Sequence, residues 1–190
     1  MKLTYFVVTN EGVVATNEAE NALEISTKSR GIGMKYSAFC LDVRYRLNGE
    51  DRLTKLENVF QSSKVFEFGG AFREILLMTP VQAKTFLRRR NLGKLVGFNL
   101  GGKDFPIEPK TLFYDWIYIQ TLLSNNMLEG EIMNYRAFVD SYWNSRYQVN
   151  CQAKSLALAI FLKNNGLLED AMSSVERFSE YLNRYSKTTY

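Results

Sequence analysis

The chain has 190 residues, of which 46% are hydrophobic and 23% charged, with only 3 prolines. This composition is typical of one folded domain and excludes a disordered chain. The longest apolar run, residues 156–162, is far shorter than the roughly 20 residues that a membrane helix needs, and the N-terminus lacks the apolar core of a signal peptide. We therefore expect a single domain over residues 1–190, in a soluble protein that stays in the cytoplasm.

The sequence contains no histidine. This excludes the usual Ser-His and Cys-His nucleophile pairs, H-E-x-x-H zinc sites and a histidine general base. Acid-base chemistry would fall to Asp, Glu, Lys or Tyr. Cys40 and Cys151 lie far apart and form no C-x-x-C pattern, so neither a disulfide framework nor a cysteine metal site is indicated, and we expect both to be buried as small hydrophobic residues.

Positive charge is concentrated in the first part of the chain. Residues 1–110 contain 17 Lys and Arg against 12 Asp and Glu, whereas residues 111–190 contain 7 against 8. The N-terminal part would therefore face an anionic partner. The alternative is that a net charge of +4 is ordinary for a soluble protein of this size.

The expected elements begin with a β-hairpin. Residues 5–8 and 13–15 are short β-prone runs, joined by the turn sequence Asn10-Glu11-Gly12. Residues 26–35 are polar, basic and rich in glycine, which indicates a loop. The apolar run at residues 38–41 bounds this loop.

Helical spacing begins at Leu53 and dominates the rest of the chain. Leu53, Leu56 and Phe60 mark one face of a helix that ends near two glycines, and Pro80 suits the first turn of another helix. Residues 95–109 are expected to be strand or loop. The predicted helices span residues 53–68, 72–78, 80–90, 111–123, 127–139, 151–164 and 167–185. The sequence thus predicts a predominantly α-helical α+β domain with a small N-terminal sheet, and residues 151–164, apolar on almost all sides, at the centre of its core.

The helix after Leu53 carries a polar stripe. At 100° per residue, Gln61 lies about 40° from Glu57, and Lys64 lies about 20° from it on the other side. Leu53 and Phe60 lie within roughly 60° of Glu57, so this carboxylate borders the face that should turn inward. A carboxyl group there loses hydration and becomes a useful acid, an effect that Lys64 would oppose. The simpler alternative is a surface contact of Glu57 with Lys64 or Gln61.

Other candidate binding residues lie in separate segments. In the loop at residues 26–35, Lys28 or Arg30 and the backbone amides suit a phosphate or pyrophosphate, although a solvated basic loop is the simpler interpretation. Trp116 is either a core residue or a stacking platform for a base. Residues 140–146 combine an acid, aromatic rings and an arginine, which suit a sugar or nucleotide, unless Asp140 only caps a turn. The densest basic run is usually a solvated face but would attract nucleic acid, and comprises Lys84, Arg88, Arg89, Arg90 and Lys94.

Two motifs in this order resemble those of one known family. The pattern E-x-x-x-Q-x-x-K begins at Glu57, and D-x-x-W runs from Asp140 to Trp143. With them, the chain resembles the NADAR superfamily of NAD- and ADP-ribose-associated proteins, most closely its branch of antitoxins paired with DarT-type DNA ADP-ribosyltransferases. Further stretches that carry the resemblance are residues 27–33, 36–39, 56–67, 69–70, 113–116, 135–140 and 150–155.

The resemblance implies a single NADAR/YbiA-like domain and an N-glycosidase. Such proteins cleave bonds between a ribose C1 and a nitrogen, and the antitoxin branch is able to remove ADP-ribose from guanine in DNA. It implies ADP-ribosylated DNA as substrate, ADP-ribose as product and a DarT-type toxin as partner, with no metal and no cofactor. The reaction passes through an oxocarbenium-like state, which needs a carboxylate near the sugar, an activated water and a proton for the leaving base.

The resemblance also assigns roles to residues of this chain. Glu57 is expected beside the scissile ribose and Asp140 as the second acid, and the two roles could be exchanged. Lys64 would orient Glu57 or stabilise the leaving group. The pyrophosphate and base are expected to contact a wider set, namely Lys28, Arg30, Gly31, Lys35, Gln61, and Trp116 or Trp143.

The chain departs from the family pattern at two places. Ala71 stands where the antitoxin branch tends to have proline, and residues 143–147 replace a stretch of the Phe-Asn-Pro type. Two other functions therefore stay open. One is a YbiA-like N-glycosidase for small ribosyl metabolites, and the other is a non-catalytic protein that binds ADP-ribose or NAD.

Overall fold

In this computed structural model, residues 3–143 and 151–186 are described. The chain forms two compact units, which we call the first and the second unit. The first unit combines the chain up to residue 37 with the chain from residue 115, and the second unit contains residues 38–114. Both contain strands and helices, so the α+β class is confirmed. Within the described residues, no helix has the length and apolar character to cross a membrane.

The first unit contains a four-stranded sheet. Its order is β2 (Val13–Thr16), β1 (Tyr5–Val8), β10 (Ala137–Val139) and β3 (Leu23–Glu24). β1 is antiparallel to β2 and to β10, whereas β10 is parallel to β3. The predicted hairpin is confirmed. Its turn requires glycine at position 12, because φ is +139° and a Cβ atom would lie 2.5 Å from the carbonyl oxygen of Tyr185.

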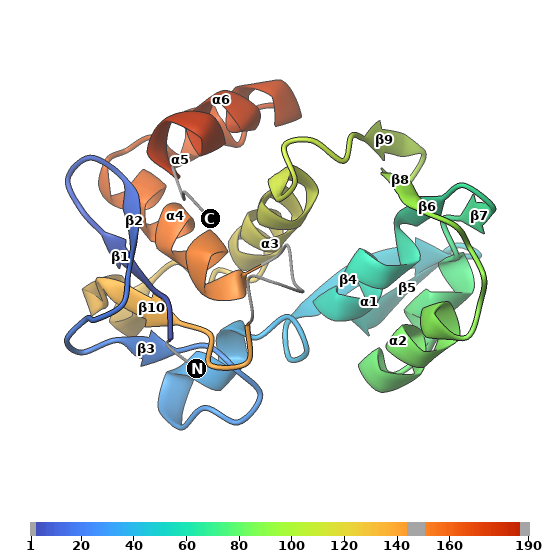
Figure 1. Ribbon diagram of the computed structural model, residues 1–190, viewed down its shortest axis with the longest axis horizontal. Helices are drawn as coiled ribbons and strands as arrows, with labels where there is room; N and C mark the ends of the chain where they lie inside the picture. Colours follow the sequence, from blue (N-terminus) through green and yellow to red (C-terminus); the bar gives the residue numbers. More distant parts are fainter. Residues whose placement is uncertain (1–2, 144–150, 187–190) are drawn as a thin grey trace. The chain divides into compact units, whose positions relative to one another are not determined.

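Helix α4 (Gln152–Asn164) occupies the core of the first unit, as predicted. Residues 153–162 are all buried, and α4 packs against β1, β2 and β10 (Figure 1). Helices α5 (Leu168–Ala171) and α6 (Val175–Tyr185) follow. The single helix predicted over residues 167–185 is interrupted because the side chain of Ser174 caps α6 by accepting a hydrogen bond from the backbone N–H of Arg177.

One predicted helix of the first unit is wrong. Residues 127–139 do not form a helix; they contain the short 3-10 helix η3 (Gly130–Asn134) and the strand β10. Phe138 is opposite Phe6, and Val139 is opposite Tyr5, in the antiparallel ladder with β1. The pairing of these residues with strands far away in the chain therefore outweighs the helical spacing of their apolar side chains.

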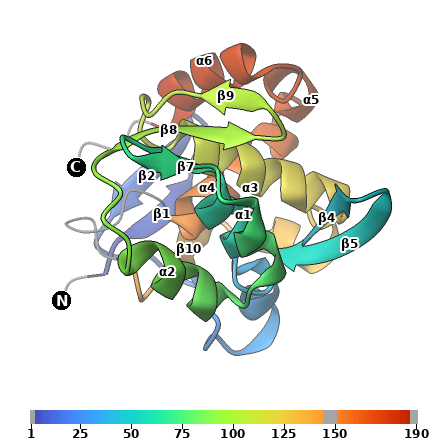
Figure 2. The same cartoon turned by 90° about the vertical axis from the view of Figure 1, so that its right-hand side faces the viewer.

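The second unit contains two sheets. β4 (Asp42–Leu47) and β5 (Glu50–Lys55) form a hairpin, and the other sheet has the order β7 (Gly69–Gly70), β6 (Lys64–Phe66), β8 (Leu95–Leu100), β9 (Lys103–Phe105). Helix α1 (Leu56–Ser62) packs against the 3-10 helix η2 (Arg73–Leu77) and against α2 (Pro80–Arg88), and Figure 2 shows α1 and α2 side by side.

The helix predicted from Leu53 is shorter than expected. Leu53 lies in β5 opposite Arg44 and is 64% exposed, so it does not turn inward. α1 begins at Leu56, where the backbone N–H groups of Leu56 and Glu57 donate to the carbonyls of Leu41 and Ala38 at 2.9 and 3.0 Å. These bonds satisfy two of the four N–H groups that a helix start leaves free.

Helix α3 (Leu112–Ser124) contains the boundary between the units. Its first turn contributes rings to the core of the second unit, where Phe98 stacks on Phe113 with centroids 4.3 Å apart and Tyr114 meets Phe60 edge to face. The predicted first-turn position of Pro80 in α2 is confirmed, with Thr79 and Gln82 forming a capping box. Cys151 is buried as predicted, whereas Cys40 is only partly buried.

Candidate functional site

In the second unit, Glu57 is the centre of a polar group that we call the Glu57 cluster. The residue is 8% exposed. Its Oε1 accepts a hydrogen bond from Nε2 of Gln61 at 2.8 Å and lies 3.2 Å from Nζ of Lys84. Nζ of Lys64 donates to Oε1 of Gln61 at 2.9 Å. Glu57, Gln61, Lys64 and Lys84 are therefore one connected network around a buried carboxylate.

The cluster differs from the surface contact that the sequence allowed. Glu57 is buried, and its ionic partner is Lys84, while Lys64 reaches it through Gln61. Burial lowers the pKa of Lys64; the negative charge of Glu57 opposes this shift, and the positive charge of Lys84 adds to it. A lysine with a lowered pKa gives up its proton more readily, which suits a proton donor. Burial and the charge of Glu57 raise the pKa of the nearby Tyr114.

Lys84 is the residue of this cluster that sequence reasoning missed. It was counted with the basic run of residues 84–94, but its Nζ contacts Glu57 and lies 4.4 Å above the ring of Phe39. The pairing depends on the packing of α2 against α1. No local spacing in the sequence encodes this pairing.

In the first unit, Asp140 follows strand β10. One carboxylate oxygen accepts from the backbone N–H of Tyr142 at 3.1 Å, and the other accepts from Nε2 of Gln152 at 3.0 Å. Gln152 also donates to the carbonyl of Ile25 at 3.1 Å. Burial raises the pKa of Asp140, the charge of Glu24 adds to the rise, and these hydrogen bonds oppose it. Across residues 3–143 and 151–186, no Lys or Arg forms an ion pair with Asp140.

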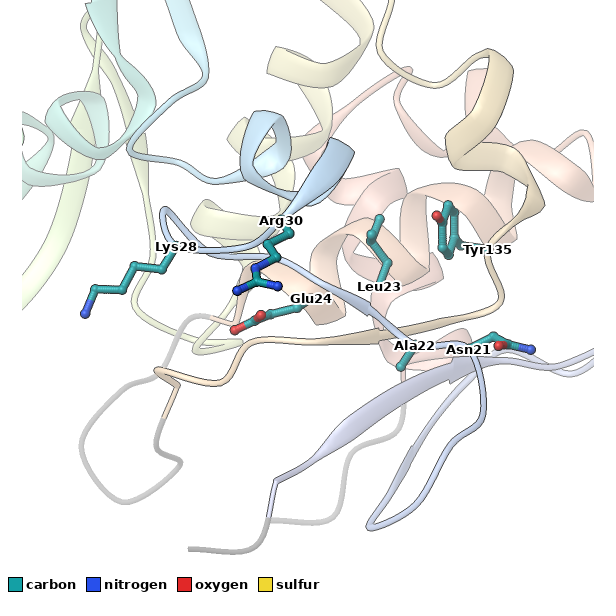
Figure 3. Close-up of a pocket in the computed structure, with 7 residues that line it drawn as sticks. All are labelled: Asn21, Ala22, Leu23, Glu24, Lys28, Arg30 and Tyr135. Carbon is teal, nitrogen blue, oxygen red and sulfur yellow. The ribbon is translucent and has the colours of Figure 1, made fainter.

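A pocket of about 460 Å³ lies in the first unit (Figure 3). One of its lining residues, Glu24, lies opposite Val139, the residue before Asp140, in the ladder of β3 with β10. Ser141 donates a hydrogen bond to the carboxylate of Glu24, and Nζ of Lys28 lies 4.9 Å from the ring centre of Tyr142. Figure 3 shows the end of Arg30 beside the carboxylate of Glu24, whereas Lys28 extends away from it. The lining residues are Asn21, Ala22, Leu23, Glu24, Lys28, Arg30 and Tyr135.

The predicted phosphate loop is partly ordered by its own hydrogen bonds. The backbone N–H of Ser26 donates to Oγ of Ser29 at 2.7 Å, and the hydroxyl of Ser29 donates to the carbonyl of Ser26 at 2.6 Å. The 3-10 helix η1 (Gly31–Tyr36) follows, and its first residue, Gly31, has a φ of +71°. Lys28 and Arg30 line the pocket together, whereas the exposed Lys35 does not line it.

The two tryptophans lie against core rings. Trp116 is 6% exposed and meets Phe178 edge to face at 5.4 Å; Trp143 is 7% exposed and meets Phe6 in the same way at 5.8 Å. Stacking of either ring on a base stays a prediction. The departure from the family pattern after Trp143 lies at residues 144–147, outside the described residues.

No group of three His, Cys, Asp or Glu side chains in the described part of the chain has an arrangement that could hold a metal ion.

Searches of curated proteins found no relative that matches this sequence. One family model matches residues 9–190, and its description is DarT1-associated NADAR antitoxin. The match includes the Glu57 cluster, Asp140 and the pocket, and covers almost the whole chain. The chain therefore belongs to the family of DarT1-associated NADAR antitoxins.

Proposed function

We propose that this protein is an N-glycosidase that removes ADP-ribose from guanine bases in DNA and so reverses the modification made by a DarT-type toxin. Membership of the family supports an antitoxin role. The observation that carries the chemical part is the Glu57 cluster, in which a buried carboxylate is held by Lys84 and Gln61. A carboxylate in such a setting suits the stabilisation of positive charge that develops on a sugar ring.

In the proposed reaction, the bond between ribose C1 and the guanine nitrogen breaks, and its electron pair stays on that nitrogen, which takes up a proton. The oxygen of a water molecule then bonds to C1, and the proton that the water loses returns to the group that protonated the nitrogen. Glu57 stabilises the oxocarbenium-like sugar, and Lys64, whose pKa is lowered by burial, supplies the proton to the leaving base.

The proposal gives the first unit the binding part of the reaction. Asp140 positions the ribose hydroxyls or the water, and Lys28 and Arg30 bind the pyrophosphate. The pocket that these two cations share with Glu24 supports this assignment, since Arg and Lys are the side chains that recognise phosphate groups. The reaction as proposed needs no cofactor, and Trp116 or Trp143 would stack on a base.

The test is release of ADP-ribose from DNA. The purified protein is incubated with EDTA on an oligonucleotide that carries ADP-ribosylated guanine, beside an oligonucleotide with thymine-linked ADP-ribose. Release is expected from guanine only, and the Glu57→Gln variant should release none at the same enzyme concentration. ADP-ribose is separated and quantified by liquid chromatography.

Other outcomes would replace the proposal. Turnover of small phosphoribosyl amines without turnover on DNA would support the metabolite N-glycosidase. Binding of ADP-ribose without turnover on any substrate would support the non-catalytic alternative. A stable complex with the toxin, together with toxin inhibition by the Glu57→Gln variant, would point to antitoxin action by direct contact.

A further inference from the structure

Helix α2 has a groove on the face that turns away from Glu57. The groove has a volume of about 400 Å³, and its lining includes Val81, Phe86, Arg89 and Arg90. At 100° per residue, Val81 and Phe86 lie about 60° and 160° around the helix from Lys84. Arg89 and Arg90 directly follow the helix, which ends at Arg88. α2 therefore contacts the Glu57 cluster with one face and forms this groove with another.

The groove combines exposed cations with exposed apolar surface. Arg89 lines the groove, and Arg88, the residue before it, lies next to the groove without lining it. Both are exposed, and neither forms an ion pair with any carboxylate in the described parts of the chain. Val81, in the same groove, is 71% exposed. Charged groups that lack a partner and lie beside apolar surface are typical of a surface that binds an anionic, partly apolar ligand.

Arg90 is held in a fixed position at the end of the helix. One guanidinium nitrogen donates to the carbonyl of Phe86 at 2.9 Å, and the guanidinium carbon lies 3.3 Å above the centre of the Phe86 ring. Phe72 meets the same ring edge to face at 5.6 Å. The result is a planar cation stacked on an aromatic ring, and such planes are surfaces on which nucleobases stack.

We infer that this groove binds the single-stranded DNA that flanks the modified guanine, with one phosphate at Arg89 in the groove, the next phosphate at the adjacent Arg88, and a base on the Arg90–Phe86 pair. The inference rests on the proposed function for the identity of the substrate strand. A strand supplies both phosphates for the free arginines and flat bases for the stacked guanidinium, whereas an acidic peptide supplies only the charge. Helix α2 would then contact the bound strand next to one face and Glu57, through Lys84, with another.

The test measures binding of an unmodified single-stranded oligonucleotide by fluorescence anisotropy over a salt series. Arg88→Ser/Arg89→Ser should lower the slope of log affinity against log salt by about 1.4, since each phosphate contact contributes roughly 0.7 for single strands. Arg90→Lys keeps the charge and should leave the slope unchanged, but should weaken binding by at least about fivefold through loss of stacking. The matched control is Arg44→Ser/Arg46→Ser, which removes two exposed charges from β4 and should bind almost as the parent does.

A second arm separates this inference from the proposed function. Arg88→Ser/Arg89→Ser should raise KM on the modified oligonucleotide and leave the rate on guanosine-linked ADP-ribose unchanged. If the parent protein hydrolyses neither substrate, the proposed function fails, while the anisotropy measurement still decides whether the groove binds a strand.

Unchanged binding in both groove variants, or an equal loss in the β4 control, would overturn the inference that the groove binds single-stranded DNA. So would groove variants that bind DNA normally but no longer bind the toxin, because the groove would then take a protein. Thermal melting shows whether each variant folds.

Discussion

Glu57 in the second unit is a buried carboxylate and Asp140 in the first is a half-buried one, and the groups around them differ. Glu57 faces Lys84 and Gln61, with Lys64 one hydrogen bond further away. Among the described residues, the side chain of Asp140 accepts from the backbone N–H of Tyr142 and from Nε2 of Gln152, both neutral, and burial and the charge of Glu24 raise its pKa. In the proposed reaction this difference fits two tasks. Glu57, held by Lys84 and Gln61, stabilises the positive charge that develops on the sugar, and Asp140 positions the ribose hydroxyls or the water.

The largest effect is expected from Glu57→Gln. The amide keeps the size of the side chain but removes the charge, so the oxocarbenium-like sugar loses its stabilising partner. We expect the turnover number to fall by about a thousandfold, with the melting temperature close to that of the parent. Single-turnover release of ADP-ribose measures the chemical step.

Glu74→Gln is the matched control for that variant. It makes the same change at an exposed glutamate in η2 of the same unit, and its rate should equal that of the parent. A Glu57→Gln rate within tenfold of the parent rate would mean that Glu57 does not stabilise the transition state. Its difference from Asp140 would then have no bearing on the reaction.

Asp140→Asn is expected to lower turnover by about a hundredfold, because in the proposed reaction the carboxyl group of Asp140 positions the ribose hydroxyls or the water, and an amide does not reproduce its contacts. It should also change the pH dependence of stability. The raised pKa means that the folded state binds this proton more tightly than the unfolded state, whose value is near 3.8. The contribution of Asp140 is present in full below that value and is lost as pH rises through the raised folded pKa.

Urea unfolding at a series of pH values measures this linkage. The parent should lose this part of its stability as pH rises, and Asp140→Asn should not. Identical pH dependence in the two proteins would show that Asp140 carries no raised pKa, and the contrast with the Glu57 cluster would then lose its physical basis.

The parts of the fold that the sequence predicted correctly are those with local signals. The hairpin at Gly12, the start of α2 at Pro80 and the buried helix α4 each follow from turn chemistry, capping or periodicity within a few residues. β10 was predicted as helix because its strand partners lie far away in the chain. The single domain over residues 1–190 stays a prediction from length. The division into two compact units, with residues 38–114 in the second, depends on tertiary contacts that the length of the chain does not encode.

The same holds for the candidate site, where contacts within one segment follow from the sequence and contacts between distant segments do not. The link between Gln61 and Lys64 follows from helical spacing, although Lys64 itself lies just beyond the end of α1. The pair of Lys84 with Glu57 and the contact of Lys28 with Tyr142 each join segments that only tertiary packing brings together. Sequence patterns therefore identified the carboxylates but not the groups that distinguish their roles.

Asp115 is a buried carboxylate to which the proposed reaction gives no role, so it can be compared with Glu57 and Asp140. It is 1% exposed, and one of its oxygens accepts a hydrogen bond from Oγ of Ser155, which links α3 to α4. The other oxygen, Oδ2, has no hydrogen-bond partner among the described residues. Ser155→Ala should therefore destabilise the protein by about 2 kcal/mol, because it removes a hydrogen bond to a buried polar group.

Urea unfolding of Ser155→Ala measures this loss, and turnover per folded molecule should not change. Ser124→Ala, at the exposed end of α3, serves as control and should cost much less stability. A normal stability with reduced turnover in Ser155→Ala would instead place Asp115 with Glu57 and Asp140 among the residues that support the reaction.

The smallest of the expected effects, and the one that most sharpens the contrast, comes from Lys84→Met. Glu57 loses its ion pair but keeps Gln61, so we expect turnover at neutral pH to fall by only about tenfold. The positive charge of Lys84 helps to lower the pKa of Lys64, so its removal should raise that pKa and move the alkaline limb of the rate profile to higher pH. Lys94→Met, which removes the same charge next to β8, should leave both quantities unchanged. A lower rate with an unmoved alkaline limb would mean that Lys84 only holds Glu57, and that the proton for the leaving base comes from a group other than Lys64.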